Sequence, residues 1–318
     1  MTAHADDIEC PLCHSVDTGL LSTISTADLT TIYRRDLGVD VGPLLTRNAT
    51  VSLRVCAQCT LQFFTPPLPG GDDFYDQLQR SDWYYMTDKP EYQYAGALVS
   101  GGDCVLEVGS GKGAFRRYLP NDVEYTGLEL SLDAVATAGA AGVKVLPEMI
   151  ESHAVSNEGK YDSCFGFQVL EHIPDVRGFL NSCVRVVRPG GLLCFSVPND
   201  EGFVGASVNE VLNMPPHHMT RWRRTTFERV AELLNLVIVA IEEEPLSPVH
   251  YPNVITQYWV AQLSRSPEPG RNVDPRWRTK MATNAGRMAA KVMAKRHLDA
   301  RLLPKGHTLT AVLRVPTQ

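Results

Sequence analysis

Short apolar runs, each bounded by glycine, proline or polar residues, recur along the chain and predict β-strands. The clearest of them cover residues 51–55, 104–109, 123–129, 235–241 and 308–315. Three other segments, 114–120, 225–235 and 277–303, have the spacing of helices. In the last of these, apolar residues recur at three- and four-residue steps, at Met281, Ala285, Met288 and Val292. The pattern therefore predicts a folded chain that mixes strands and helices.

The composition is that of a globular protein, since 44% of the 318 residues are hydrophobic and 21% are charged. This length is enough for one large domain or two modest ones. No apolar run approaches the roughly 20 residues that cross a bilayer. The amino-terminal sequence MTAHADDIEC is acidic and lacks the apolar centre of a secretory signal. We therefore expect a soluble, cytoplasmic protein without a membrane span.

The charge is unevenly distributed. Thirty Lys and Arg against 36 Asp and Glu give a net charge of −6, which argues against nucleic-acid binding through overall basicity. Residues 264–306, however, carry 11 Lys or Arg and only three acidic residues. We interpret this segment as the solvated basic face of a helix that covers the domain. The alternatives are attraction of a phosphorylated acceptor, of RNA or of a membrane surface; the membrane is the weakest, because no bulky aromatic residue lines the apolar stripe.

Four of the eight cysteines occur before residue 60 as two C-x-x-C pairs, Cys10/Cys13 and Cys56/Cys59. Two such turns can each present two thiolates to one ion, which is the pattern of a tetrahedral four-cysteine zinc site. The spacing predicts a structural zinc with no position open to water; the alternative is four free thiols under a small subdomain. The other four cysteines are single residues in apolar stretches and are expected in the core: Cys104, Cys164, Cys183 and Cys194.

A stretch rich in turn residues, TPPLPGGDD at 65–73, separates the cysteine pairs from the rest of the chain. Many aromatic residues follow in a segment that is expected to be helical and to place most of them in the core or at interfaces. We divide the chain into four parts: a zinc-binding module at 1–70, a helical bridge at 71–100, a central domain at 101–245, and a helical cover with a final strand at 246–318.

The predicted strand 104–109 runs directly into a glycine-rich turn, GSGKG at 109–113. Glycines between a strand and a helix let a ligand lie against backbone where a Cβ would collide. The turn also satisfies the dinucleotide pattern G-x-G-x-x-A, and Glu129 at the end of the next strand can bind a ribose in either case. A P-loop is excluded, since no G-K-[ST] is present. Glu107, two residues before the turn, favours a cofactor with an amino group, because a carboxylate attracts a cation and a pyrophosphate has none.

Further segments extend this motif, in the order VLEVGSGKG, YTGLELS, YDSCFGFQVLEHIPD and VRPGGLLCFSVPN. With these motifs in this order and spacing, the chain resembles the class I S-adenosylmethionine-dependent methyltransferases. The resemblance implies an α/β fold, with a Rossmann-like sheet, helices on both faces, and the cofactor across the carboxyl ends of the strands. It implies methyl transfer from a sulfonium that is already a good leaving group, so that the protein chiefly aligns the reactants and excludes water.

The resemblance also assigns residues to the cofactor. Glu107 is expected near the methionine amino group and Glu129 at the ribose hydroxyls. The resemblance implies a third strand at 143–149, and after it no acidic residue falls in register at the usual adenine contact in the segment PEMIE, so packing and backbone are expected to serve there. Phe167 and Gln168 are expected to face the methyl-bearing end. The remaining assigned residues line the methionine and ribose (Gly109, Ser110, Gly111 and Gly113) or the adenine (Leu130, Met149 and Ile150).

Three histidines are candidates for catalysis. His217 and His218 lie in the loop NMPPHHMTRW, which in the resembling family overhangs the acceptor, and either can act as general base toward a hydroxyl. The alternative for both is a lid histidine bonded to backbone. His172 follows Glu171 in VLEHIPD, where both residues are expected in the pocket wall, with contact to the reaction as the alternative. Some relatives bind a divalent ion through E-x-x-E-H and a distant histidine, but Gln168 is a poorer ligand at the first position, so we do not predict that ion.

These features predict a methyltransferase that acts on a small molecule, such as a sugar or a nucleotide-linked sugar in polysaccharide or natural-product biosynthesis. A second hypothesis is a zinc-bearing RNA methyltransferase, which the C-P-x-C start also resembles. Aromatic residues interleaved with basic ones are sparse in the amino-terminal module, which argues against nucleic acid. A third hypothesis is a non-catalytic scaffold that binds the cofactor, which the intact Glu107, glycines and Glu129 disfavour. The oligomeric state is not predicted.

Overall fold

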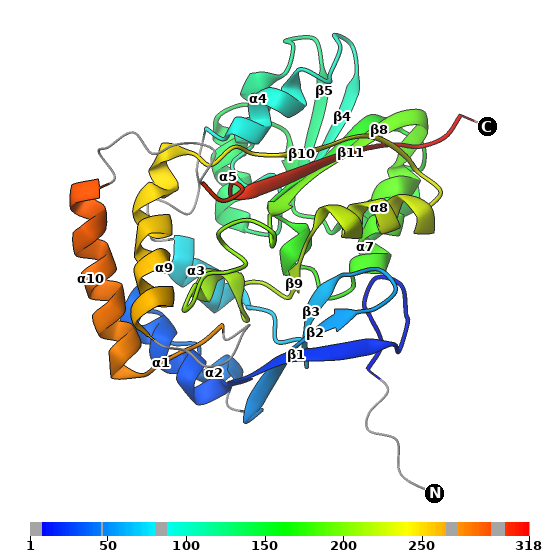
Figure 1. The fold of residues 1–318 in the computed structure, drawn as a ribbon. Coiled ribbons are helices and arrows are strands. Elements are labelled where there is room, and N and C mark those ends of the chain that lie inside the picture. Colours follow the sequence, from blue (N-terminus) through cyan, green and yellow to red (C-terminus); the bar gives the residue numbers. More distant parts are fainter. Residues whose placement is uncertain (1–7, 46, 80–87, 265–271, 294–302, 318) are drawn as a thin grey trace, which may run out of the picture.

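The computed structural model describes residues 8–45, 47–79, 88–264, 272–293 and 303–317. Within these ranges the chain forms a large mixed sheet, a small antiparallel sheet and a pair of helices at one end (Figure 1). None of the described helices is long and apolar enough to span a membrane. Part of the predicted helical bridge, with Trp83, Tyr84 and Tyr85, lies outside the described residues.

The large sheet has the strand order β10-β11-β8-β7-β4-β5-β6. Its strands are β4 (Cys104–Val108), β5 (Glu124–Leu128), β6 (Val145–Leu146), β7 (Tyr161–Phe167), β8 (Val187–Pro198), β10 (Val237–Glu243) and β11 (Thr308–Arg314). The neighbouring strands β8, β7, β4, β5 and β6 pair in parallel. Strand β11 lies between β10 and β8 and is antiparallel to both. The carboxyl ends of the parallel strands meet along one edge, which is where ligands bind in open α/β sheets. The predicted α/β fold with a Rossmann-like sheet is confirmed.

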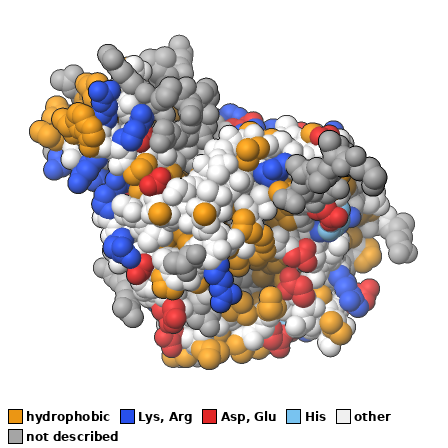
Figure 2. Space-filling model, turned by 90° about the horizontal axis from the view of Figure 1, so that it is seen from below, with side chains coloured by type: hydrophobic (Ala, Val, Ile, Leu, Met, Phe, Trp, Pro, Cys, Tyr) orange, Lys and Arg blue, Asp and Glu red, His pale blue; other side chains and the backbone are white. Residues whose placement is uncertain are grey.

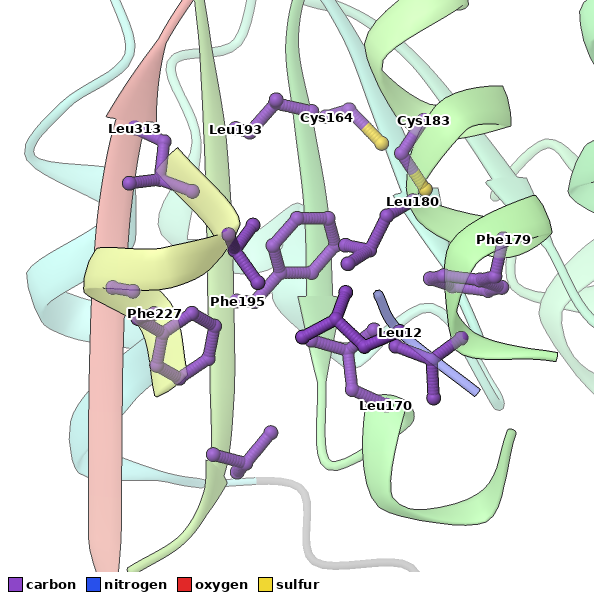
Figure 3. Packing of buried hydrophobic residues seen from close by; sticks show 14 of the residues in the cluster. Leu12, Cys164, Leu170, Phe179, Leu180, Cys183, Leu193, Phe195, Phe227 and Leu313 are labelled. Atoms are coloured by element: carbon purple, nitrogen blue, oxygen red, sulfur yellow. The ribbon is translucent and has the colours of Figure 1, made fainter. Parts of the chain in front are cut away.

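Side chains that alternate along the central strands pack against helices on both faces of this sheet. One face is covered by α6 (Ile150–Ser156), α7 (Val176–Val186) and α8 (Arg224–Leu233), the other by α4 (Pro90–Gly96) and the 3₁₀ helix η1 (Ala114–Tyr118). A further helix, α5 (Leu132–Ala140), connects β5 to β6. Figure 3 shows the first face, where Phe179 and Leu180 of α7 lie close to Phe195 of β8. The prediction that the other four cysteines lie in the core is confirmed for Cys164, Cys183 and Cys194, which are buried. Cys104 is only partly buried.

The small sheet combines three amino-terminal strands with a short strand from the central domain. β1 (Thr18–Ser25), β2 (Thr50–Cys56) and β3 (Gln62–Thr65) are antiparallel, and β9 (Thr220–Arg221) pairs with β3. In that pairing Gln62 lies opposite Arg221, and Phe63 lies opposite Thr220. Because β9 comes directly after Met219, the amino-terminal sheet holds one end of the histidine loop.

The amino-terminal helices hold the other end of that loop. α1 (Thr26–Leu37) begins at Ser25, whose hydroxyl accepts the N–H of Asp28, and ends at Gly38 with φ of 70°. From α1, the buried Tyr33 donates its hydroxyl to the carbonyl of Val211 over 2.7 Å. Val211 begins the 3₁₀ helix η3 (Val211–Asn213), just before the histidines. Two shorter helices complete this region, α2 (Gly42–Leu45) and α3 (Asp72–Gln79).

At the opposite end of the chain, the 3₁₀ helix η4 (Pro248–His250) leads into α9 (Tyr251–Leu263), which packs beside α10 (Trp277–Met293). Figure 1 shows α10 as the outermost element on this side of the molecule. The helix predicted at 277–303 is therefore confirmed as far as Met293, and its remainder to residue 302 lies outside the described residues.

Two predicted elements are shorter in the structure. The segment 114–120 forms only the five-residue η1, because Pro120 cannot continue a helix. The strand predicted at 143–149 is reduced to Val145–Leu146, because Pro147 has no N–H for the ladder.

Candidate active site

The glycine turn follows β4 and crosses the carboxyl edge of the large sheet. Gly109, Gly111 and Gly113 have φ of 69°, 53° and 71°, in the left-handed region that side chains disfavour. A Cβ on Gly109 would lie 2.4 Å from Cγ2 of Val169, just after β7. The N–H of Gly109 donates to the carbonyl of Leu128 at the end of β5 over 2.8 Å. Glycine is therefore required here both by the backbone conformation and by the available space.

Two carboxyl groups flank this turn. Glu107 in β4 is 1% exposed, and the hydroxyl of Tyr125 in β5 donates to its Oε2 over 2.5 Å. Burial raises the pKa of Glu107 to about 8, although the bond from Tyr125 lowers it. Glu129, just after β5, accepts the N–H of Gly111 and the N–H of Ser131, both over 2.9 Å. The structure thus brings both predicted acidic residues to the glycine turn.

A second polar group lies just beyond Val169, the residue that touches the turn. Glu171 and His172 belong to the 3₁₀ helix η2 (Leu170–His172), and His217 and His218 come from the loop before β9. One ring nitrogen from each histidine lies within 4.8 Å of those of the other two. The Nε2 atoms of His172 and His218 each lie 4.0 Å from Oε1 of Glu171. The three histidines predicted as catalytic candidates therefore lie together, and two of them, His172 and His218, face the Glu171 carboxyl.

The Glu171 carboxyl is unusual among the described residues. It is 1% exposed, and neither of its oxygens has a hydrogen-bond partner within the described part of the chain. A buried polar group without a partner costs free energy and points to a ligand that supplies the missing contact. Burial raises the pKa of Glu171 to about 8.

Each imidazole uses its Nδ1 atom for a hydrogen bond. The Nδ1 of His172 lies 2.6 Å from the carbonyl of His217, and the Nδ1 of His217 lies 2.8 Å from the carbonyl of Leu212. The Nδ1 of His218 lies 3.2 Å from Oδ1 of Asn213. Since a carbonyl oxygen only accepts, Nδ1 of His172 and of His217 carries the proton, which places the lone pair of a neutral ring on Nε2.

Burial also fixes the charge of these rings. It lowers the pKa of His172 to about 4 and the pKa values of His217 and His218 well below their ordinary range. All three imidazoles are therefore neutral near pH 7. A neutral imidazole is the form that accepts a proton, and it is also the form that binds a metal.

Residues that the sequence did not single out as site residues complete this group. Tyr75 of α3 has its ring centroid 6.1 Å from that of His172, and its hydroxyl lies 3.4 Å from the Nδ1 of His172. Asn213 of η3 contacts His218, and Tyr125 contacts Glu107. Tyr75 is distant from both histidine segments along the chain, so no spacing could connect it with them.

The four cysteines of the two C-x-x-C pairs meet at the end of β2. All four Sγ atoms lie within 4.8 Å of one another, and the distances from Cys10 to Cys59 and from Cys13 to Cys56 are both 3.4 Å. These distances exceed the ~2.05 Å of a disulfide bond. They lie near the roughly 3.8 Å that separates sulfur atoms around a tetrahedral zinc with ~2.3 Å bonds.

The two cysteine turns have the same backbone hydrogen bonds. In the first, Cys10 donates its N–H to the carbonyl of Ser15 and accepts the N–H of His14; in the second, Cys56 does the same with Leu61 and Thr60. His14 and Thr60 also share a positive φ, of 60° and 63°. The repeated turn presents two sulfurs from each side, so both the donors and their arrangement fit a tetrahedral ion.

Known proteins share the motifs of this site. A family model described as a methyltransferase domain matches residues 106–195, which include the glycine turn and Glu171. The chain is 31% identical over 176 residues to the ubiquinone biosynthesis O-methyltransferase of Escherichia coli O6:H1, with 51% of this chain and 70% of that protein covered. The chain belongs to the S-adenosylmethionine-dependent methyltransferases. A crystal structure of a SAM dependent methyltransferase from Archaeoglobus fulgidus shares the fold, with a TM-score of 0.51, 15% identity, and coverage of 76% of this chain and 99% of that one.

The surroundings of the remaining predicted cofactor contacts differ. Leu130 and Met149, just beyond β5 and β6, are 61% and 56% exposed, so their apolar side chains are accessible to a flat ring. The side chain of Ile150 is 2% exposed and packs in the core, which leaves its backbone for the predicted adenine contact. Phe167 is also buried, with its ring centroid 4.8 Å from that of Tyr92.

Gln168 and Ser110 lie where the strands meet the turn. Gln168 has φ of 59°, an uncommon conformation outside glycine, and its Nε2 lies 3.5 Å from Oε1 of the buried Glu91. Such strain at the end of a central strand is frequent in functional sites. Ser110 is 4% exposed, and a Cβ on Gly127 of β5 would lie 2.5 Å from its hydroxyl oxygen.

These residues fit S-adenosylmethionine, which supplies an electrophilic methyl group when it is bound. The glycine turn leaves backbone accessible where a Cβ would collide. Glu107 offers a buried carboxyl for an ammonium, and Glu129 lies at the position of the ribose contact in the resembling family. The apolar side chains beyond β5 and β6 suit an adenine. Beside these residues lies the group of histidines around Glu171.

Proposed function

We propose that this methyltransferase transfers the methyl group to a hydroxyl oxygen of a small molecule. The observation that carries the proposal is the buried Glu171 carboxyl, which has no hydrogen-bond partner among the described residues and faces the Nε2 atoms of His172 and His218 at 4.0 Å. A hydroxyl is both a donor and an acceptor, so it can satisfy the carboxyl and an imidazole lone pair together.

The histidine group gives such a hydroxyl a path for its proton. When the oxygen forms its bond to the methyl carbon, the bond from that carbon to the sulfonium sulfur would break and leave a neutral thioether, while the O–H bond breaks and the proton passes to the Nε2 of His172 or His218. The adjacent Glu171 carboxyl, whose pKa burial raises to about 8, stabilises the resulting imidazolium by charge in its ionised form, and the ionised fraction grows as the pH rises toward 8. Because these rings are neutral near pH 7, they are ready to accept the proton without prior deprotonation. An amine or thiol acceptor has less need of such a base.

The burial of this group supports a small acceptor. His217 and His218 are 8% and 6% exposed, and the ring of Tyr75 lies against that of His217. The O-methyltransferase named above, which acts in ubiquinone biosynthesis, also supports an oxygen acceptor. The sugar or nucleotide-linked sugar predicted from the sequence is one class of hydroxyl that this arrangement suits, and a phenol is another, since either can lie against the Tyr75 ring.

We further propose that the four cysteines hold a structural zinc ion. With four thiolate ligands no position remains for water, so the ion has no part in methyl transfer. Its contribution is to hold the end of β2 and the start of β3, the strand that pairs with β9. Through β9 the zinc site is connected to the loop that places His217 and His218 over Glu171.

The acceptor is tested by incubating the enzyme with a metabolite extract and methyl-labelled S-adenosylmethionine, followed by mass spectrometry. We expect label in a small molecule as a methyl ether, and an initial rate of labelling at least about a hundredfold lower with the Glu171→Gln variant. A defined panel of a catechol, a free hexose and a nucleotide-linked sugar then distinguishes the classes. Label found only in RNA, or on nitrogen, would overturn the proposal.

The affinity for S-adenosylmethionine is expected to depend on pH through Glu107. Its pKa of about 8 means that the carboxyl is neutral below that pH, whereas pairing with an ammonium requires the ionised form. The Kd should therefore rise by about tenfold for each pH unit below 8 and level off above it. Isothermal titration calorimetry between about pH 6 and pH 9 measures this dependence.

Two variants isolate the contribution of Glu107. Glu107→Gln should bind more weakly, by about a hundredfold above pH 8, and should lose the dependence that is due to this carboxyl. Tyr125→Phe removes the hydrogen bond that lowers the pKa of Glu107. The inflection in the plot of Kd against pH should therefore move to higher pH in this variant. The same slope in the wild type and in Glu107→Gln would show that another group, such as the cofactor's own amine, causes the dependence.

A further inference from the structure

Helix α10 buries small residues and exposes large apolar ones, which is the reverse of a helix that covers a domain. Its buried positions, Thr279, Ala282, Gly286 and Ala290, face α9. A Cβ on Gly286 would lie 2.8 Å from the Cα of Thr256, so the two helices approach closely. The large apolar side chains of α10 are therefore not needed for its packing.

Those side chains form one stripe on the outer surface. Trp277, Met281, Met288 and Val292 are 66%, 61%, 71% and 69% exposed. At about 100° of rotation per residue they fall within about 60° of arc, roughly opposite the buried positions. The predicted helix does expose its basic residues, but its apolar stripe is exposed as well, and the stripe contains an aromatic residue, Trp277, where none was predicted. Hereafter these four residues are called the α10 stripe.

Cations border the α10 stripe on both sides. On the same helical projection, Lys280, Arg287 and Lys291 lie along one flank and Arg278 along the other. The helix contains no acidic residue between Trp277 and Met293. Figure 2 shows a group of hydrophobic side chains bordered by Lys and Arg at the left edge of the molecule, on the side where Figure 1 places α10.

We propose that α10 is an interfacial helix that lies on an anionic lipid bilayer. A helix with an exposed apolar stripe, an aromatic residue in that stripe and flanking Lys or Arg has the pattern that inserts to the depth of the headgroups while its cations contact anionic lipid. The outermost position of α10 lets it meet a flat surface without obstruction from α9 (Figure 1). No spanning helix is required, and none is present among the described residues.

Charge favours the bilayer over the other occupants of such a surface. A second copy packed stripe to stripe would bring two sets of flanking cations together, which is unfavourable. RNA would satisfy the cations but would leave the apolar stripe in contact with phosphates and water. An anionic bilayer satisfies both at once.

The test is co-sedimentation of the full chain with vesicles. We expect binding to phosphatidylcholine vesicles that contain about 30% phosphatidylglycerol, weaker binding at high salt, and little binding to phosphatidylcholine alone. The double variant Lys280→Gln/Lys291→Gln should lower the partition coefficient by about thirtyfold, since each cation near an anionic surface contributes about a factor of five. Met281→Asn/Met288→Asn should lower it by at least about tenfold.

Matched controls distinguish the effect of the α10 surface on vesicle binding from the effect of lowering the overall positive charge and from the effect of unfolding. Lys144→Gln/Lys160→Gln removes two exposed cations from another part of the surface and should change binding less than twofold. The stripe variants should keep the wild-type Tm, because all the changed side chains are exposed. Binding to vesicles should also shift the maximum of the wild type's tryptophan emission to shorter wavelength, and Trp277→Phe should remove that shift.

Three outcomes would overturn the proposal. The first is equal binding to neutral and anionic vesicles, or binding that the Met281→Asn/Met288→Asn variant leaves unchanged. The second is a dimer that the stripe variants convert to monomer, without vesicle binding, which would assign the surface to a second copy. The third is binding of RNA alone, which would assign the cations to phosphates.

Discussion

Cys56→Ser is expected to remove the bound zinc and to unfold the small sheet, with a loss of at least about a hundredfold in kcat. A structural zinc in a four-cysteine site contributes on the order of 10 kcal/mol to folding, comparable to the whole stability of a domain. Serine keeps the volume of the side chain but offers no thiolate. Metal content by mass spectrometry and Tm by differential scanning calorimetry measure the first two effects.

The activity loss follows from the connection between the cysteines and the histidine loop. Cys56 ends β2, which pairs with β3, and β3 pairs with β9 through Phe63 and Thr220. When this sheet is lost, His217 and His218 lose one of the two anchors of their loop. The affinity for S-adenosylmethionine should change much less, because the glycine turn belongs to the large sheet.

Cys104→Ser is the control for the same substitution, since Cys104 is a partly buried cysteine that lies outside the cluster. It should retain the metal and most of the activity. The zinc proposal would fail if the freshly purified wild type contained no zinc and its four clustered thiols were freely alkylated. It would fail equally if Cys56→Ser kept the wild-type Tm.

At about pH 8 and above, where the Glu171 carboxyl is ionised, Glu171→Gln is expected to lower kcat by about a hundredfold to a thousandfold while leaving the Kd for S-adenosylmethionine within about twofold. Glutamine keeps the shape of the side chain but cannot stabilise an imidazolium by charge. Because burial raises the pKa of Glu171 to about 8, its ionised form is costly in the folded protein, so the neutral variant should be at least as stable as the wild type. A fall in activity without a fall in Tm would therefore indicate a role in the reaction rather than in folding.

Histidine variants measure how much each of the three rings contributes to accepting the proton. His172→Gln and His218→Gln should each lower kcat by about a hundredfold, because their Nε2 atoms face Glu171 at 4.0 Å. His217→Gln should cost less if its ring chiefly supports that of His172, to which its carbonyl is bonded. His250→Gln is the control, a partly buried histidine that contacts Phe203 instead of this group.

Two results would contradict the proton-transfer role. One is near wild-type turnover in both His217→Ala and His218→Ala, which would leave these rings as a structural lid. The other is activity that a chelator abolishes and a single added divalent cation restores, with the cysteine-bound metal still in place. That result would mean that the histidines and Glu171 hold a catalytic metal, against our prediction from Gln168.

The motifs of the central domain could be interpreted from the sequence because their chemistry is local. A strand followed by Gly109, Gly111 and Gly113 needs no distant residue to explain it, since the positive φ values demand glycine wherever the turn lies. The two C-x-x-C pairs are similar, because each turn contains its own hydrogen bonds. Spacing along the chain was sufficient in these cases.

Spacing along the chain could not predict whether each side chain is buried or exposed, or in which direction it points. Ile150 and Phe167 occupy the motif positions of cofactor contacts, yet the side chain of Ile150 packs in the core and the ring of Phe167 packs against Tyr92. In α10 the periodicity located the apolar stripe correctly but gave no indication of its direction. Small residues can pack as well as large ones when a partner helix approaches closely, as α9 does at Gly286.

The sequence by itself determined the enzyme class, the fold and the grouping of the four cysteines, because these depend on residues that are close together or on motifs in a fixed order. Only the tertiary structure decided that η2 and the loop before β9, more than 40 residues apart, converge on Glu171. It also decided that an amino-terminal strand holds that loop in place, and that α10 directs its apolar stripe outward. These features depend on contacts between distant segments, and the geometry of such contacts is set by packing and hydrogen bonding in the folded chain.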